Sequence, residues 1–289
     1  MFRIAILGCE NSHADNFIKH IKSEYPDKIE VVGVYTEYED AKERMRTNYG
    51  VYVADRFDEF VGRIDGLVVT ARHGRDHLRF AEPYFASGIP MFIDKPITAS
   101  VDDAVKLAGK LKSHNIRFTG GSSCVHAPEL CDLREAFGSG EGVLSGYVSA
   151  PINLCNPYGD FRFYSQHLVQ IMQSVFGNYP KTVTAKQVGE KVDVLFGYES
   201  YNVHATYVDG VYRYNAAVLL ADGLVSRELT VDSKVFTLEF DCFYELLLGG
   251  AGEESVRDFI SPVFVIDAVV RALASGREEQ VAEIPAESV

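Results

Sequence analysis

The sequence predicts an α/β protein that begins with a doubly wound parallel sheet and continues into an α+β domain with a large, mainly antiparallel sheet. In the first part of the chain, short apolar runs alternate with stretches of helical periodicity, the pattern of successive β-α-β units. After about residue 122, helical stretches are followed by a series of strand-like runs separated by turn residues. We therefore expect two domains, residues 1–121 and residues 122–289.

The elements of the first domain follow from apolar runs of strand length and from apolar residues spaced three and four apart. Pro83 is expected to kink or divide its helix, because proline cannot donate the helical hydrogen bond. Gly50 closes the preceding helix. The expected strands are residues 3–8, 29–34, 67–71, 91–93 and 116–119, and the expected helices are residues 14–25, 41–49, 75–87 and 100–113.

The second domain is expected to start after a hinge near Gly120–Ser123. Asp209-Gly210 and Asp222-Gly223 are typical of hairpin turns, and the alternation over residues 203–208 predicts a sheet with one buried face. The expected helices are residues 128–137, 162–176 and 255–275, and the expected strands are residues 181–188, 192–198, 202–208, 211–220, 224–231 and 234–240.

Aromatic residues recur along these strands, and a wide apolar sheet face is unusual on a monomer. We therefore expect a homo-oligomer, a dimer or a tetramer, that pairs through the C-terminal sheet. The aromatic residues concerned are Phe196, Tyr198, Tyr201, Tyr207, Tyr212 and Tyr214.

Composition and charge exclude several kinds of partner. A net charge of -13 argues against nucleic acid and anionic membranes, and no apolar run has the length of a membrane span. The five cysteines are odd in number and form no CxxC pair, which indicates reduced thiols. Met1 leads directly into a strand, without a signal-peptide pattern. We expect a cytoplasmic protein.

The apolar run Met91–Ile93 stops abruptly at Asp94-Lys95-Pro96. Ligands of open α/β sheets bind beyond the carboxyl ends of the strands, so Lys95 is predicted to lie beside a reacting atom. Pro96 would fix the backbone that presents it. The alternative is an ordinary strand-end lysine in solvent.

The turn after the first strand is a reduced form of a dinucleotide-binding turn, whose G-x-G-x-x-G pattern lets the backbone approach a pyrophosphate. Only Gly8 of that pattern remains, followed by Cys9, Glu10, Asn11, Ser12 and His13. Glu10 would set a carboxylate beside a diphosphate unless it points away. Asn11 and Ser12 could donate hydrogen bonds, and the helix N-terminus still favours an anion. A plain strand-turn-helix is the alternative.

Thr36 and Glu37 follow the second strand, where an acid commonly accepts hydrogen bonds from the adenosine ribose. Glu37 would repel a 2′-phosphate, which favours NAD over NADP; an ordinary exposed acid is the alternative. His73 and His77 are four residues apart, but no third ligand lies near them, so we expect no metal site. A histidine near the nicotinamide is the better hypothesis.

Three motifs together resemble the glucose–fructose oxidoreductase/inositol dehydrogenase/MocA (Gfo/Idh/MocA) family over nearly the whole chain. The run Val69–Ala71 is followed by His77, and Asp94-Lys95-Pro96 stands where the family carries Glu-Lys-Pro. The run Tyr164–Gly177 resembles the family helix with D-x-x-x-H-x-x-D before a glycine. His167 matches its histidine, whereas Phe163 and Gln170 replace the two aspartates.

The resemblance implies an NAD-dependent oxidoreductase that transfers a hydride between nicotinamide and a hydroxyl-bearing carbon of a sugar, polyol or related small molecule. Lys95 would polarise the hydroxyl oxygen and His167 would accept its proton, both in one cleft. Tyr164, Tyr158 or Asp160 could replace the missing carboxylate. The expected substrate-binding residues are Lys95, Arg162, Tyr164 and His167, and the expected cofactor-binding residues are Gly8, Glu10, Asn11, Ser12, His13, Thr36, Glu37, Thr70, Ala71, His73, His77, Asp94, Lys95 and Pro96.

Two other functions remain open at the level of the sequence. The reduced glycine turn favours a relative that keeps the fold but acts as a binding or regulatory protein. A third possibility is that bound NAD supports a non-redox net reaction such as glycoside cleavage. The retained Lys95 and His167 favour an enzyme over a binding protein.

Overall fold

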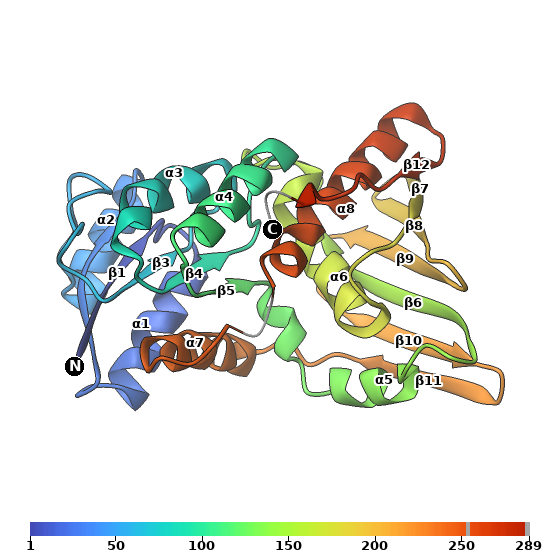
Figure 1. Ribbon diagram of the computed structural model, residues 1–289, viewed down its shortest axis with the longest axis horizontal. Helices are drawn as coiled ribbons and strands as arrows, with labels where there is room; N and C mark the ends of the chain where they lie inside the picture. Colours follow the sequence, from blue (N-terminus) through green and yellow to red (C-terminus); the bar gives the residue numbers. More distant parts are fainter. Residues whose placement is uncertain (253–254, 287–289) are drawn as a thin grey trace. The chain divides into compact units, whose positions relative to one another are not determined.

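The computed structural model describes residues 1–252 and 255–286, which form two compact units (Figure 1). The first unit contains Met1–Gly121 and Phe236–Arg257, and the second contains Ser122–Val235 and Asp258–Pro285. The chain first passes from one unit to the other between Gly121 and Ser122, inside the expected hinge. The expected second domain is not continuous, because the chain returns to the first unit at Phe236.

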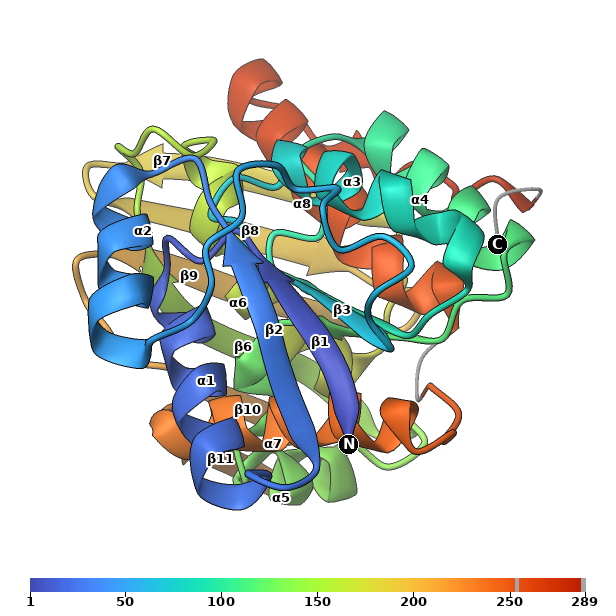
Figure 2. The same cartoon turned by 90° about the vertical axis from the view of Figure 1, so that its left-hand side faces the viewer.

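The first unit is built on a five-stranded parallel sheet with the order β2-β1-β3-β4-β5, which confirms the doubly wound fold. Figure 2 shows β1 between β2 and β3. A 3₁₀ helix over Glu82–Ser87 continues α3, so Pro83 divides this segment as expected. The strands are β1 (Phe2–Leu7), β2 (Ile29–Tyr35), β3 (Gly66–Val69), β4 (Met91–Asp94) and β5 (Phe118–Gly121), and the helices are α1 (Ser12–Glu24), α2 (Glu39–Arg44), α3 (Arg75–Ala81) and α4 (Val101–Ser113).

The strand expected over residues 234–240 is wrong: these residues belong to a helix, α7 (Ser233–Leu247). The alternation in Val-Phe-Thr-Leu-Glu-Phe imitates a strand, but the buried residues continue at helical spacing. Phe240, Phe243 and Leu247 are buried in the first unit's core, and the Phe240 and Phe17 ring centroids lie 5.3 Å apart. The apolar stripe of α7 therefore covers the same sheet face as α1, whereas α3 and α4 lie on the other face (Figures 1 and 2).

The second unit contains a seven-stranded sheet with the order β11-β10-β6-β9-β8-β7-β12, in which only the β6–β9 pair is parallel. The interior strand β6, between β10 and β9, was not expected from the sequence. The strands are β6 (Val143–Ile152), β7 (Thr182–Val188), β8 (Lys191–Gly197), β9 (Asn202–Asp209), β10 (Asn215–Leu220), β11 (Gly223–Glu228) and β12 (Glu279–Gln280), and the helices are α5 (Leu130–Phe137), α6 (Phe161–Phe176) and α8 (Val256–Ser275).

One of the two expected hairpins is present. Leu220 pairs with Gly223, so Asp222 lies in the tight turn that joins β10 to β11. The hairpin expected at Asp209-Gly210 is wrong, because β9 pairs with β6 and β8 and not with β10. This dipeptide begins a connection that crosses over β6.

The two faces of the second sheet differ in burial. Gly146, Val148, Val203 and Ala205 alternate inward and pack beneath α6, α5 and α8. Most of the aromatic residues expected to pair subunits also belong to this internal core: Phe196 and Tyr207 are fully buried, Tyr214 nearly so, and Tyr198 and Tyr201 pack against it. A helical layer of the same unit, not a second subunit, therefore covers them.

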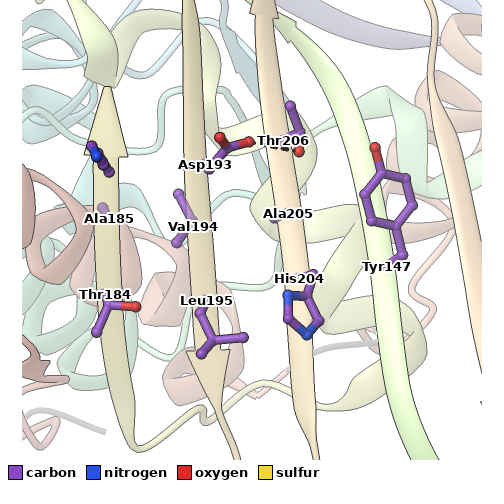
Figure 3. Close-up of a pocket in the computed structure, with 10 residues that line it drawn as sticks. Tyr147, Thr184, Ala185, Asp193, Val194, Leu195, His204, Ala205 and Thr206 are labelled. Atoms are coloured by element: carbon purple, nitrogen blue, oxygen red, sulfur yellow. Dashed lines mark hydrogen bonds between the residues drawn. The ribbon is translucent and has the colours of Figure 1, made fainter. Parts of the chain in front are cut away.

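The outward face of β6–β9 carries a pocket of about 570 Å³ (Figure 3). Its lining alternates between polar and apolar side chains, including Tyr147, Asp193, Leu195, His204 and Thr206. No helix within the described ranges 1–252 and 255–286 is long and apolar enough to cross a membrane.

Candidate active site

The turn after β1 retains the close backbone approach that its one glycine permits. Gly8 has φ +85°, and a Cβ atom on Gly8 would lie 2.3 Å from the backbone nitrogen of Ala71. The Thr70 hydroxyl donates to the Gly8 carbonyl over 2.9 Å. A side chain at position 8 would therefore separate the first turn from the end of β3, where the expected residues Thr70 and Ala71 lie.

Asn11 is the N-cap of α1 and holds the turn in place by hydrogen bonds. Its Oδ1 accepts the N–H groups of His13 at 2.8 Å and Ala14 at 3.4 Å, and its Nδ2 donates to the Thr70 carbonyl. These bonds fix the turn but also occupy two of the donors at the helix N-terminus. Ser12, the first residue of α1, is exposed.

Glu10 points towards the ends of β2 and β3. Its Oε1 accepts the Arg72 N–H at 2.8 Å, and its Oε2 accepts the Thr36 hydroxyl at 3.0 Å. Burial raises the pKa of Glu10, and these hydrogen bonds oppose the increase. The carboxylate thus bridges two strand ends at the sheet edge where open α/β sheets bind ligands.

Glu37 is paired, which its sequence neighbours did not indicate. Its Oε1 lies 2.9 Å from Nη2 of Arg79 and accepts from the Tyr35 hydroxyl at 3.4 Å. Both members of the ion pair are about half exposed, with side-chain exposures of 48% for Glu37 and 42% for Arg79. The negative charge that would repel a 2′-phosphate is therefore partly balanced by a guanidinium from α3.

A buried ion pair lies directly before Lys95. Nδ1 of His13 is 2.7 Å from Oδ2 of Asp94, and Asp94 Oδ1 accepts the N–H of Lys95 at 2.7 Å. Burial alone would raise the pKa of Asp94, but His13 and then Lys95 hold it below its ordinary value. Lys95 is itself buried and joins Pro96 through a cis peptide bond. His13, which replaces the third glycine of the expected turn, therefore secures the carboxylate that precedes Lys95.

Glu239 of α7 adds a second buried acid to this cluster. It is 1% exposed, and neither carboxyl oxygen has a hydrogen-bond partner among the described residues. Burial and then the negative charge of Asp94 raise its pKa well above the ordinary value, opposed by Lys95. The surroundings of Glu239 therefore favour its protonated form. An acid within the apolar stripe of a helix was the available signal, concealed because this segment was taken for a strand.

The two histidines after β3 hold the backbone. His77 is fully buried, its Nε2 lies 2.7 Å from the Ala71 carbonyl, and burial lowers its pKa. Nδ1 of His73 accepts the Arg75 N–H at 3.2 Å, and partial burial lowers the pKa of His73. A search of the part of the chain that the structure describes found no group of three or more potential metal ligands.

In the second unit, His167 lies on α6 and its ring is held from the start of the unit. Nδ1 of His167 is 2.7 Å from the Ser122 Oγ and 3.3 Å from the Cys124 Sγ. Gln170, at the position of the family's second aspartate, accepts the Ser122 N–H at 2.7 Å. The group on the ring nitrogen is thus a hydroxyl that the sequence analysis did not select.

Aromatic rings surround the other expected residues of α6. The Phe163 ring centroid lies 5.1 Å from that of Tyr158 and 5.9 Å from that of Tyr164, and the Tyr164 ring lies 4.6 Å from His167. Arg162 forms an ion pair with Asp267 at 3.1 Å. Phe163 therefore continues an aromatic wall beside His167, and the Arg162 charge is already shared with a carboxylate.

The expected residues fall into two groups, one in each unit. The cofactor residues and Lys95 lie at the carboxyl ends of β1–β4, and His167 lies with Arg162 and Tyr164 on α6. Ser122 and Glu239 were not among the residues predicted for the site. A serine directly after the Gly120-Gly121 hinge was the only local signal for Ser122, because its partner lies 45 residues away.

Comparison with known proteins gives one family match and many structural matches. Residues 2–122 match the family described as an oxidoreductase family with an NAD-binding Rossmann fold. A search of curated proteins found no significant match.

The solved structures that resemble the chain cover nearly all of it at low identity. Scyllo-inositol dehydrogenase from Lactobacillus casei, with bound NAD(H) and scyllo-inositol, aligns with a TM-score of 0.84 and 14% identity over 98% of this chain and 100% of that chain. Myo-inositol 2-dehydrogenase from Lactobacillus plantarum gives 0.84 and 13% over 97% and 99% of the two chains. GenD2 from gentamicin A biosynthesis, in complex with NAD, gives 0.82 and 15% over 98% and 97%. At these identities the likeness establishes the fold.

Proposed function

We propose that the chain is an NAD-dependent dehydrogenase of the Gfo/Idh/MocA family, whose NAD-binding Rossmann model matches residues 2–122. It would transfer a hydride between nicotinamide and a hydroxyl-bearing carbon of a sugar, polyol or related small molecule. The observation that carries the proposal is Lys95, buried and presented directly beyond β4 by the His13–Asp94 pair.

The residues of the first unit fit a dinucleotide. Gly8 has no Cβ, so its turn packs directly on Ala71 at the carboxyl end of β3, the end of the sheet where such folds bind ligands. Thr36 and Glu37 follow β2, the place of the ribose. Glu10 turns its carboxylate away to Thr36 and Arg72. We propose NAD as the preferred cofactor, because both acids remain at this edge.

The chemistry assigned to the chain's own residues is proton transfer and charge stabilisation. Bound NAD would supply the hydride acceptor. The Lys95 ammonium would stabilise the developing alkoxide, and the His167 imidazole would accept the hydroxyl proton. This requires Lys95 and His167 to act on one substrate, each from its own unit.

The test is NADH formation by the full-length protein with a panel of sugars, inositols and acyclic polyols. Lys95→Ala and His167→Ala should each lower turnover by roughly 10²–10⁴-fold, the range of a positioned acid–base group, and leave NAD binding largely intact. Lys106→Ala and His114→Ala, at exposed positions within α4 and at its C-terminal end, are the matched controls. Turnover by the wild type that survives both site substitutions would refute the assignment.

One observation favours the rival function of a binding or regulatory protein. Asn11 already uses the N–H groups of His13 and Ala14 that a phosphate could otherwise receive. Native mass spectrometry of the freshly purified protein separates the two functions, because a co-purified dinucleotide supports the enzyme. No binding of either nucleotide at millimolar concentration would support the rival.

We also propose that a second copy of the chain covers the outward face of β6–β9 (Figure 3). Tyr147 on this face is 40% exposed, and the face bears a pocket of about 570 Å³. Light scattering should give at least a dimer, and Tyr147→Arg should shift it towards the monomer. Tyr52→Arg, at a 54% exposed position of the first unit, should not. A monomeric wild type at micromolar concentration would contradict the proposal.

A further inference from the structure

The hydrogen bond between Ser122 and His167 is buried and short. Oγ of Ser122 lies 2.7 Å from Nδ1 of His167, and the two residues are 0% and 4% exposed. In this setting water cannot replace a lost partner at low cost. The hydroxyl therefore has a strong influence on how the imidazole is oriented and where its proton resides.

Ser122 is itself fixed by the helix that carries His167. Its N–H donates to Oε1 of Gln170 at 2.7 Å, and the same oxygen accepts from Nε2 of Gln166 at 2.8 Å. The Ser122 Oγ also accepts the N–H of Cys124 at 3.3 Å. Gln166, His167 and Gln170 lie within one turn of α6, so the helix holds both the ring and the partner of the ring.

The Cys124 thiol contacts the same nitrogen, with Sγ 3.3 Å from Nδ1 of His167. Sulfur is a weak hydrogen-bond donor and acceptor, whereas a hydroxyl forms strong bonds in both roles. Of the two neighbours, Ser122 is therefore the one that can determine the state of the ring. Cys124 provides a natural control, because it touches the same atom without the same bonding strength.

We propose that Ser122 is the positioning residue of His167. Its hydroxyl binds Nδ1, so that Nε2 is the nitrogen that exchanges a proton with the substrate. The inference rests on the function proposed above, in which His167 is the base. Phe163, the residue one turn before His167 where the family pattern has an aspartate, has no polar atom for this task.

The proposal places the proton of the neutral ring on Nδ1, where it donates to the Ser122 Oγ, so that Nε2 carries the lone pair. During oxidation the substrate O–H bond would break and an Nε2–H bond would form. The C–H bond would break as well, its hydride passing to bound NAD⁺ and a C=O bond remaining. The resulting imidazolium keeps its Nδ1–H bond to Ser122, so the ring need not turn between the two states.

The test reads the tautomer of His167 directly, by ¹⁵N NMR of the full-length protein labelled at histidine. His167→Gln identifies the signals. The wild type should show mainly the Nδ1–H tautomer, Ser122→Ala should shift the population towards Nε2–H, and Ser122→Thr should restore it. Cys124→Ala should leave the tautomer as in the wild type. Thermal unfolding confirms that each variant is folded.

Kinetics on a substrate from the panel supply the second readout. Ser122→Ala should lower kcat by roughly 10- to 100-fold with little change in KM, as when a partner that orients a functional histidine is removed. An unchanged His167 spectrum in Ser122→Ala, or an equal shift in Cys124→Ala, overturns the proposal. If Ser122→Ala shows the expected spectral shift but the wild type reduces no NAD, the positioning role is supported and the dehydrogenase function is refuted.

Discussion

Separating His13 from Asp94 should destabilise the first unit far more than breaking a surface ion pair. The His13 side chain is 7% exposed and that of Asp94 is 0% exposed, with 2.7 Å between Nδ1 and Oδ2. Removing one partner of a buried ion pair leaves the other without compensation, which typically costs about 3–5 kcal/mol. The free-energy cost of His13→Ala should lie near the lower end of this range, because Asp94 still accepts the Lys95 N–H at 2.7 Å.

A double-mutant cycle isolates the interaction. His13→Ala, Asp94→Ala and the double variant are compared by urea denaturation, and the coupling energy should lie at about 1–3 kcal/mol, the range of contacting buried residues. Glu30→Ala is the control: its partner Arg3 is 3.7 Å away and both side chains are about half exposed, so its loss should cost less than about 1 kcal/mol. A coupling energy below about 1 kcal/mol, no larger than the loss expected for an exposed ion pair, would refute the reasoning.

The cycle also has a predicted pH dependence. The pKa of Asp94 is lowered in the folded protein, so its contribution is present above the unfolded value of about 3.9 and is lost as pH falls through the folded value. The coupling energy should therefore disappear in strong acid. Since Asp94 also holds the backbone of Lys95, His13→Ala should lower turnover as well as stability.

Two further substitutions test the cluster and the turn. Glu239 has a raised pKa, so the folded state retains a proton that the unfolded state loses above about pH 4.3, and stability falls as pH rises. Glu239→Gln should remove that decline, whereas parallel stability curves for wild type and variant would contradict it. Glu10→Gln should tighten NAD binding about tenfold, or 1.4 kcal/mol, because it removes a negative charge from the turn that would hold the diphosphate, even though the carboxylate points to Thr36 and Arg72. Glu10→Gly, which restores a glycine of the G-x-G-x-x-G pattern, should tighten it further. Calorimetric titration is the measurement, and weaker binding by Glu10→Gln would show that the carboxylate instead binds the ribose.

The parts of the fold that could be predicted are those whose signals are local. The strand that ends at Asp94-Lys95-Pro96 is indicated by an apolar run followed by a proline. The segment that begins with α3 divides at Pro83 because proline cannot donate the helical hydrogen bond. The prediction of a strand over residues 234–240 was wrong because alternation over one short stretch is typical of a strand. Only its continuation to Phe243 and Leu247 reveals a helix.

The contacts that could not be predicted join distant parts of the chain. Asp94 meets His13 from another strand end, and His167 meets Ser122 across 45 residues. Arg79 forms an ion pair with Glu37 from 42 residues away, which the basic residues of the neighbouring sequence do not reveal. Residue identity therefore predicted candidate groups for the chemistry, but the partner of each group depends on tertiary packing.

The substitution Phe163→Asp shows whether this chain replaced one partner of His167 by another. Position 163 precedes His167 by one helical turn, so an aspartate there could reach the ring. In the wild-type background Nδ1 already contacts Ser122, so the new carboxylate gains no bond to the ring. Phe163→Asp alone should therefore lower turnover, because it breaks the aromatic wall with Tyr158 and Tyr164.

In the Ser122→Ala background Nδ1–H could donate to the new carboxylate, and Phe163→Asp should then raise turnover. This change of sign between the two backgrounds is expected only if hydroxyl and carboxylate are alternatives at one nitrogen. The same effect of Phe163→Asp in both backgrounds would mean that residue 163 acts only on the substrate, through the aromatic wall.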